Sequence, residues 1–200
     1  MPKITIATHN EGKAKEFAAL FKPFGYEIET LSAYPELGEI EETGQSFFEN
    51  ALLKAQTVAK QLACFTVADD SGLEVEALNG APGIYSARYA GLDHDDEKNR
   101  EKLLLELAGV PAEKRQARFR CCLVVVNPAG ELMGQYEGTL AGRITEEERG
   151  DLGFGYDSLF LVPEKAKTLA ELSMAEKNAL SHRGKALELL EADLQKGRLF

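Results

Sequence analysis

The stretch Ala68-Asp69-Asp70-Ser71-Gly72 decides the fold of this sequence. An apolar run that begins at Cys64 ends there in two carboxylates, a hydroxyl and a glycine. This pattern predicts a buried strand whose C-terminal edge opens into a site. Adjacent acids repel each other, so a hard divalent cation is the best candidate to offset their charge. The alternative is an Asx turn, in which Asp69 or Asp70 bonds its own backbone.

Length and net charge limit the classes of protein to which this sequence can belong. The 200 residues suit one large domain or two closely joined lobes, and the net charge of −10 argues against a binder of nucleic-acid polymers. A small anionic ligand is still compatible, because local Lys and Arg groups and a metal can outweigh the global charge. Neither a signal peptide nor a membrane span is expected. The cysteines are expected to be reduced core residues of a cytoplasmic protein: Cys64, Cys121 and Cys122.

The pattern along the chain predicts one α/β domain spanning residues 1–200, with a mixed twisted sheet and flanking helices. Strands are expected over residues 3–7, 26–30, 64–68, 73–77, 117–126 and 158–162, with glycine-broken strand material over 132–144. Helices are expected over residues 12–21, 46–62 and 95–107. Asn10 is predicted to cap the first helix, Ser173 and Glu176 form a capping-box pattern, and Ser181 can cap the last helix.

The segment between the first strand and the first helix has the features of a phosphate site. It comprises Thr8, His9, Asn10, Glu11, Gly12 and Lys13. Free amides at a helix N-terminus attract phosphate, and a lysine in the first turn opposes the helix dipole unless an anion lies there. It is not a Walker P-loop, because the first glycine is missing and Ala14 replaces Ser or Thr. The alternative is an ordinary capped helix with a surface lysine.

Two further segments carry acids and aromatics. One acid of the pair Glu41-Glu42, together with one or both of Asp69 and Asp70, could hold Mg²⁺, with substrate phosphates and waters as the other ligands. Alone, the Glu pair is a solvated charge run. The aromatic segment contains Phe154, Gly155, Tyr156 and Asp157. Its rings could bracket a flat base while Asp157 accepts from ring N–H groups, or the rings could belong to the core beside an Asp turn.

Basic residues lie before and at the start of the expected last helix. They are Lys177, His182 and Arg183. His182 and Arg183 open that helix, where cations need a compensating ligand or acid, and Arg183 can bind a carbonyl or phosphate. They could equally be surface residues. Ser71, His182 and either Asp could also form a hydrolytic triad, but no GxSxG elbow supports this. The Gly- and Pro-rich loop over residues 79–91 is long enough to serve a site or an interface.

Taken together, these segments resemble the inosine/xanthosine triphosphate pyrophosphatase family. The resemblance spans residues 4–190 and depends on the TxNxGK start, the block ADDSGLEVEALNGAPGIYSARYAG, FGYD and SHRGKAL. It implies Mg²⁺-dependent hydrolysis of ITP, dITP and XTP to the monophosphate and pyrophosphate. It also implies a homodimer of elongated two-lobed subunits with the site in a central cleft. Purines would be selected through the O6 and N1–H groups of a 6-keto ring.

The resemblance also assigns roles to residues. It implies that residues 8–13 bind the triphosphate, that Asp70 accepts a proton and binds the metal, and that Glu41 is the second metal ligand. Ser71, the residues of the aromatic segment and the basic residues Lys177, His182 and Arg183 are implied to contact the nucleotide. Ser158 follows FGYD where many members have proline, which puts local rigidity in doubt, and His9 replaces a glycine of some relatives. Two alternatives stay open: a non-catalytic nucleotide sensor, and a pyrophosphatase for modified pyrimidine nucleotides.

Overall fold

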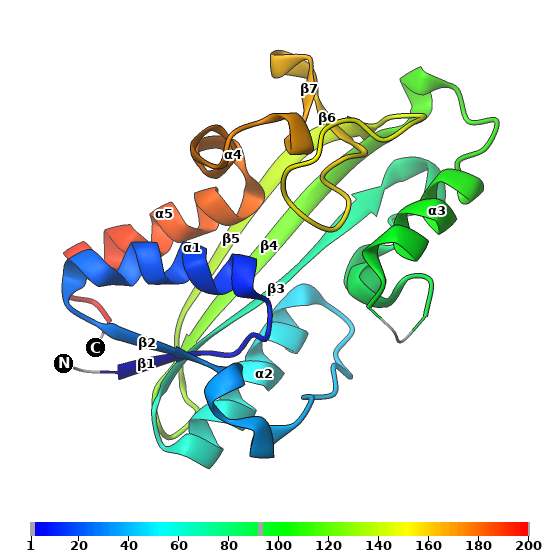
Figure 1. Cartoon of the computed structure of the whole chain (residues 1–200). Helices are drawn as coiled ribbons and strands as arrows, with labels where there is room; N and C mark the ends of the chain where they lie inside the picture. The colour runs from blue at the N-terminus through cyan, green and yellow to red at the C-terminus, as the bar shows by residue number, and fades with distance from the viewer. Residues whose placement is uncertain (1–2, 92–93, 200) are drawn as a thin grey trace. The chain divides into compact units, whose positions relative to one another are not determined.

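The structure, a computed structural model, describes residues 3–91 and 94–199. It contains a seven-stranded sheet of order β2-β1-β3-β4-β5-β6-β7 with flanking helices (Figure 1). The strands are β1 Lys3–Ile6, β2 Glu27–Thr30, β3 Phe65–Val75, β4 Gln116–Val126, β5 Leu132–Ile144, β6 Phe160–Val162 and β7 Lys167–Thr168. β1 is parallel to β2 and β3, whereas β6 is antiparallel to β5 and β7. The predicted α/β fold with a mixed sheet is confirmed.

The helices begin where polar side chains can accept from their free N–H groups. They are α1 Glu11–Phe21, α2 Phe47–Leu62, α3 Asp96–Glu106, α4 Met174–Leu180 and α5 His182–Gln195. Asn10 accepts from the Lys13 N–H group at 3.0 Å, as predicted. The predicted capping box of Ser173 and Glu176 opens α4. Ser181 accepts from the Gly184 N–H group at 3.0 Å at the start of α5.

The chain divides into two compact units, each with its own core. The first unit comprises residues 1–70, 121–137 and 186–200, and the second comprises 71–120 and 138–185. In the first, α1 and α5 cover one face of the sheet and α2 lies on the other (Figure 1). Its core joins Phe17 and Phe21 of α1 to Leu190 of α5. The core of the second unit joins Leu103 of α3 to Phe160 of β6.

The strand over residues 64–68 was expected to end at Ala68, and this expectation is wrong. β3 continues without interruption through Asp69, Asp70 and Gly72 to Val75, and the residues expected at the end of the following strand lie in a short 3₁₀ helix, Glu76–Leu78. The sheet opens because the neighbouring strand stops. β1 pairs with β3 only as far as Ile6 opposite Val67. The two acids therefore lie just beyond the end of their parallel neighbour while still in a strand.

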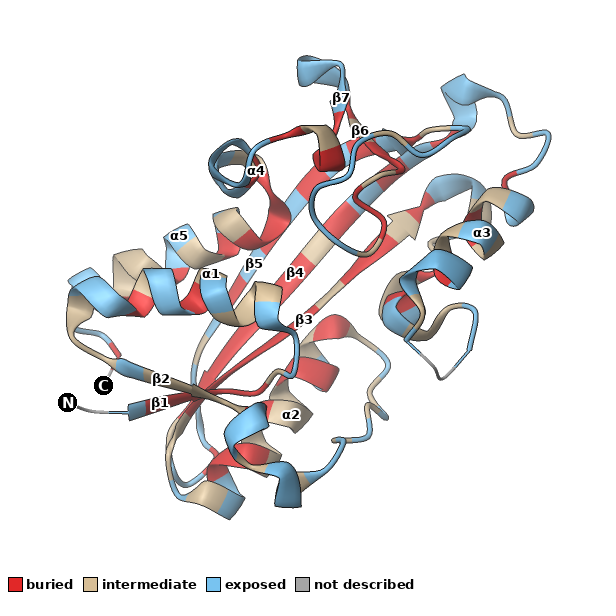
Figure 2. Cartoon of the chain, viewed as in Figure 1, coloured by how far each residue is buried: buried red, intermediate tan, exposed pale blue. Residues whose placement is uncertain are grey.

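The glycines of β5 were expected to interrupt the strand, but β5 runs unbroken for 13 residues. Close approach explains at least one of them. A Cβ atom on Gly142 would lie 2.4 Å from the Leu161 carbonyl oxygen of β6. Glycine at this position lets the two backbones pair. Figure 2 shows that β3 and β4 are mostly buried, whereas exposed and buried residues alternate along β5.

We predict that Gly184→Ala in α5 destabilises the protein. Alanine normally stabilises a helix relative to glycine. Here an added Cβ would lie 1.9 Å from the Asn178 carbonyl oxygen, so overpacking reverses the sign and the free energy of unfolding should fall by about 1–3 kcal/mol. Urea unfolding measures the change. Glu188→Ala, at an exposed position of the same helix, is the control and should change stability by about 0.5 kcal/mol or less; an equal effect of both variants would contradict the prediction.

Candidate functional site

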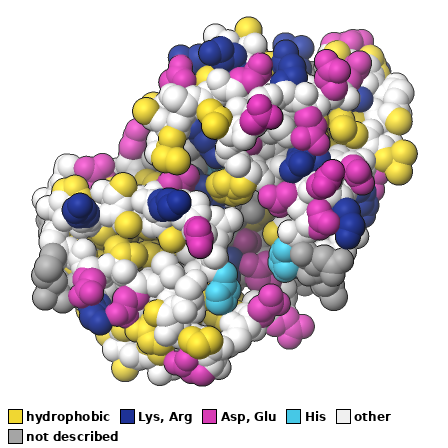
Figure 3. Space-filling view, viewed as in Figure 1, with side chains coloured by type: hydrophobic (Ala, Val, Ile, Leu, Met, Phe, Trp, Pro, Cys, Tyr) yellow, Lys and Arg dark blue, Asp and Glu magenta, His cyan; other side chains and the backbone are white. Residues whose placement is uncertain are grey.

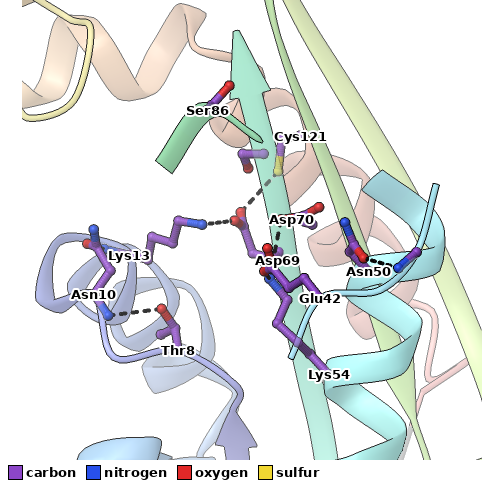
Figure 4. Close-up of polar contacts among 12 residues, drawn as sticks. Thr8, Asn10, Lys13, Glu42, Asn50, Lys54, Asp69, Asp70, Ser86 and Cys121 are labelled. Carbon is purple, nitrogen blue, oxygen red and sulfur yellow. Dashed lines mark hydrogen bonds and ion pairs between the residues drawn. The ribbon is translucent and has the colours of Figure 1, made fainter. Parts of the chain in front are cut away.

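β3 carries two consecutive acids that point to opposite faces of the sheet, because side chains alternate along a strand. Asp69 lies on the side of α1, where it forms an ion pair with Lys13. Asp70 lies on the side of α2 and is 3.3 Å from the Lys54 ammonium. Figure 4 shows both pairs. We call the group of Lys13, Glu42, Lys54, Asp69 and Asp70 the acid–lysine cluster; it belongs to the first unit.

Asp69 is held by two donors. One carboxylate oxygen pairs with Lys13, and the other accepts from the Cys121 thiol of β4 at 3.2 Å. The side chain of Asp69 is completely buried, while 17% of the Lys13 side chain is exposed. The pair therefore keeps the Lys13 ammonium at the edge of the cluster, where it can still meet an anion.

Lys54 of α2 binds three oxygens with its ammonium group. It donates to Glu42 at 2.7 Å, to the Asp69 main-chain carbonyl at 2.8 Å and to Asp70 at 3.3 Å. Burial lowers the pKa of this amine, but the charges of Asp70 and Glu42 outweigh burial and leave its pKa above the ordinary value. Lys54 is therefore a cation that offsets the charges of buried Asp70 and half-buried Glu42.

Asp70 has the properties of a proton acceptor. Burial raises its pKa to about 6, against the opposing charges of Lys54 and Lys13. Its Oδ2 atom is buried and has no hydrogen-bond partner among the described residues. A carboxylate in this state can take a proton near neutral pH and still has an oxygen for a ligand.

The acids present fit a magnesium ion. Mg²⁺ is usually held by one or two carboxylates together with waters and substrate phosphates. Glu42 and Asp70 both contact Lys54. The Oδ2 atom of Asp70 has no hydrogen-bond partner among the described residues and could therefore bind the ion. Over residues 3–91 and 94–199, no group of three or more His, Cys, Asp or Glu side chains could hold a metal without such additional ligands. The structure places Glu42 at this cluster, whereas the predicted ligand Glu41 is exposed.

The turn before α1 is ordered by its own side chains. The Asn10 N–H group donates to the Thr8 hydroxyl at 3.0 Å, and Asn10 caps the helix in turn. His9 and Glu11 are exposed, and Gly12 is half-buried. The predicted phosphate segment thus presents helix amides next to the Lys13 side chain.

The second unit contains a separate group, which we call the aromatic–basic cluster: Phe154, Asp157, Lys177, His182 and Arg183. The Lys177 ammonium donates to Asp157 at 2.6 Å and lies 4.6 Å from the centroid of the Phe154 ring. The Arg183 guanidinium carbon lies 6.0 Å from the same centroid. All members except Phe154 are buried. Phe154 is 37% exposed, so it has ring surface that can stack on a flat ligand.

Three other predicted contact residues have partners within the second unit. His182 stacks on Phe119 with ring centroids 4.8 Å apart. Ser71 lies 3.4 Å from an Arg183 nitrogen, at the long limit of a hydrogen bond. The Tyr156 ring is in the core, and its hydroxyl donates to the Ser86 carbonyl at 2.6 Å. Asp157 already accepts from Lys177 and from the Phe154 N–H group.

Sequence reasoning did not single out Lys54 or Cys121. A signal for Lys54 was present, because it lies among Ala51, Ala55 and Val58 on the apolar face of α2, where a lysine needs an acid partner. Cys121 offered no such signal beyond its place in an apolar run.

Figure 3 shows acidic and basic side chains interspersed over the visible face, so neither sign of charge forms a continuous patch there.

No helix in the described part of the chain is long and apolar enough to span a bilayer.

Comparison with known proteins finds relatives that match this chain over nearly its full length. A curated dITP/XTP pyrophosphatase of Listeria monocytogenes is 56% identical over 194 residues, which are 97% of this chain and 95% of the relative. Another, from Bacillus licheniformis, is 52% identical over 192 residues, covering 96% and 97%.

Solved structures of similar proteins also match this chain over nearly its full length. The Ham1 protein of Staphylococcus aureus superposes with a TM-score of 0.87 at 44% identity, over 98% of this chain and 99% of that one. A HAM1 protein from Coxiella burnetii gives a TM-score of 0.90 at 39% identity, over 98% and 100%. The sequence model of the Ham1 family matches residues 4–193. This chain therefore belongs to the Ham1 family.

Proposed function

We propose that the protein hydrolyses the aberrant purine nucleoside triphosphates dITP, ITP and XTP to the monophosphate and pyrophosphate, with Mg²⁺ as cofactor. The observation that carries the proposal is Asp70, a buried carboxylate with a pKa of about 6 and a free oxygen. Lys54 lies 3.3 Å from it, and Lys13 pairs with the neighbouring Asp69. Relatives more than 50% identical over nearly the full length are named dITP/XTP pyrophosphatases, which supports the same substrate class.

In the proposed reaction, Asp70 accepts a proton from the water that attacks the α-phosphorus. A general base is most effective when its pKa is close to the working pH, and a pKa of about 6 meets this condition. Lys13 and the first amides of α1 bind the phosphates and stabilise the charge that develops on them. Asp69 keeps Lys13 in place. When bound by Glu42 and Asp70, Mg²⁺ supplies positive charge that offsets the triphosphate.

The aromatic–basic cluster is proposed to recognise the base. The exposed ring of Phe154 stacks on the purine, and the ammonium of Lys177 or the guanidinium of Arg183 donates to a 6-keto oxygen. Adenine presents an amino group at that position, so two donors would face each other. The proposal further includes a cytoplasmic homodimer, and the free state of Cys64, Cys121 and Cys122 agrees with a reducing compartment.

A substrate panel tests this function. The protein is incubated with ITP, dITP, XTP, GTP, ATP and dTTP, each with Mg²⁺ or with EDTA, and released pyrophosphate is measured. Release from the 6-keto purines without the guanine amino group, and only with Mg²⁺, is the expected result. Binding of ITP without pyrophosphate release would indicate the sensor instead, and preference for dTTP would indicate the pyrimidine alternative.

We predict that Glu42→Gln weakens Mg²⁺ binding in this reaction far more than Glu41→Gln does. The Glu42 carboxylate lies at the cluster and pairs with Lys54, whereas Glu41 is exposed. Loss of a ligand charge should raise the Mg²⁺ concentration for half-maximal rate about 10- to 100-fold. A magnesium titration of ITP hydrolysis measures it. Should the two variants exchange these behaviours, Glu41 would be the metal ligand, as the sequence resemblance implied.

A further inference from the structure

The turn that carries Phe154 has a backbone that needs external support. Gly153 and Gly155, on either side of Phe154, have φ values of +81° and +60°. Glycine adopts such values without strain, but it also gives a free chain many other conformations. The exposed Phe154 ring can offer a defined stacking surface only if both flanking peptides are held.

Two side chains of α3 bind both polar groups of the Gly155 backbone. The Asp96 carboxylate accepts from the Gly155 N–H group at 2.8 Å, and the Arg100 guanidinium donates to the Gly155 carbonyl at 3.0 Å. Residues four apart lie on the same face of a helix, so α3 presents the acid and the base together. Hydrogen bonds to charged groups are shorter and stronger than neutral ones.

Arg100 is itself held from the other side. Its Nε atom lies 2.9 Å from a Glu148 carboxylate oxygen, and the second oxygen of Glu148 accepts from the Ser158 hydroxyl at 2.9 Å. Burial acts to raise the pKa of Glu148, but the bonds from Arg100 and Ser158 outweigh it and keep this pKa below its ordinary value. These side chains line a cavity of about 250 Å³ together with Phe154.

The other side of Phe154 is held within the turn. Its N–H group donates to Asp157 at 3.0 Å, and a Cβ atom on Gly153 would lie 2.1 Å from the same carboxylate oxygen. Phe154 therefore lies between one peptide bound to Asp157 and another bound to α3. A surface that is ordered before binding does not have to be ordered by the ligand.

We propose that Asp96 and Arg100 are positioning residues for the nucleotide base: by gripping Gly155 they orient the Phe154 ring before the substrate binds. This inference rests on the proposed function, because it assigns the Phe154 ring to the purine. Neither side chain takes part in proton transfer or binds phosphate in the reaction above. Their loss should therefore weaken substrate binding and leave the chemical step nearly unchanged.

The test uses Asp96→Ala and Arg100→Ala in the full chain, with Glu97→Ala and Glu101→Ala as matched controls. Both control positions are exposed on the same helix. We call Asp96 and Arg100 the clamp. For each clamp variant we expect KM for ITP to rise about 5- to 10-fold, because uniform binding is lost, while kcat stays within about 2-fold of the wild type. Arg100→Lys keeps the charge but cannot reach Glu148 and Gly155 with one planar group, so its KM should be intermediate.

Two measurements make the test independent of turnover. Amide hydrogen exchange over residues 153–158 of the free protein should accelerate about 10-fold in the clamp variants and not in the controls. ITP affinity measured by calorimetry in EDTA should fall by the same factor as KM rises. Unchanged exchange and affinity, or equal changes in the controls, would overturn the inference. If the wild type releases no pyrophosphate, the proposed function fails, and the exchange and affinity measurements still decide whether the clamp holds a ligand-binding turn.

Discussion

Asp70→Asn is expected to lower kcat for pyrophosphate release from ITP by about 10²- to 10⁴-fold, the range that a general base contributes. Asparagine keeps the shape of the side chain but cannot accept the proton of the attacking water. Nucleotide binding should remain measurable by calorimetry in EDTA, because Lys13 and the α1 amides are unchanged. The control is Glu39→Gln, at an exposed acid, which should leave the rate unaltered.

The same variant is expected to be more stable than the wild type at high pH when no metal is present. The folded pKa of Asp70 is raised from 3.8 to about 6 by burial, so the folded state prefers the protonated carboxyl. The ionised form therefore destabilises the fold, fully above pH 6 and not at all below about pH 3.8. The shift corresponds to about 3 kcal/mol. Asparagine resembles the protonated group and avoids this penalty.

Urea unfolding in EDTA at pH 8 and at pH 4 measures this prediction. Asp70→Asn should exceed the wild type in free energy of unfolding by about 1–3 kcal/mol at pH 8 and lose that advantage at pH 4. A wild type that is more stable at pH 8 would contradict the buried, unfavourable state of Asp70. Full ITP hydrolysis by the variant would remove Asp70 from the mechanism.

Lys54→Met is expected to produce the largest loss of stability among single substitutions in the acid–lysine cluster. The Lys54 ammonium contacts Glu42, Asp70 and the Asp69 carbonyl. Methionine fills a similar volume but leaves two acids near each other with one cation fewer. Breaking a buried ion pair by removing one partner costs about 3–5 kcal/mol. The pKa of Asp70 should rise further, because Lys54 is the main group that lowers it.

The loss should depend on pH and on metal. In EDTA at pH 8, urea unfolding should show the full decrease, whereas at pH 5 protonation of Asp70 removes one of the unpaired charges and the decrease should be smaller. Added Mg²⁺ should restore part of the stability, since a ligand that binds only the folded state stabilises it. Lys60→Met, at an exposed position of α2, is the control. A decrease that does not change with pH would show that lost packing, not charge, explains the effect.

The sequence predicted those features that depend on neighbouring residues. Helix caps at Asn10, Ser173 and Ser181 were correct because a cap is a contact between residues three apart, which local spacing reveals. The mixed α/β class followed from the order of apolar runs. The motifs also indicated which segments carry charged and aromatic side chains, and the structure gathers the members of each cluster within one unit.

Features that depend on neighbours distant in the chain were predicted less well. The predicted end of β3 was wrong because the sheet opens where β1 stops. The residues of β3 alone do not show how long β1 is. The glycines of β5 were interpreted as breaks, although Gly142 gives room for the backbone of β6. In each case a partner strand, not the local residues, sets the result.

The sequence by itself determined the class of fold, the helix starts and the segments that bear reactive groups, since these depend on side-chain periodicity and on contacts over a few residues. Only the tertiary structure decided that Glu42 rather than Glu41 joins Lys54 and Asp70, and that α3 grips the turn at Gly155. The physical reason is that the burial of a side chain and the charges around it depend on residues that are distant in sequence and meet only in the folded protein. The raised pKa of Asp70 exists only where α2 and β3 enclose that carboxylate together.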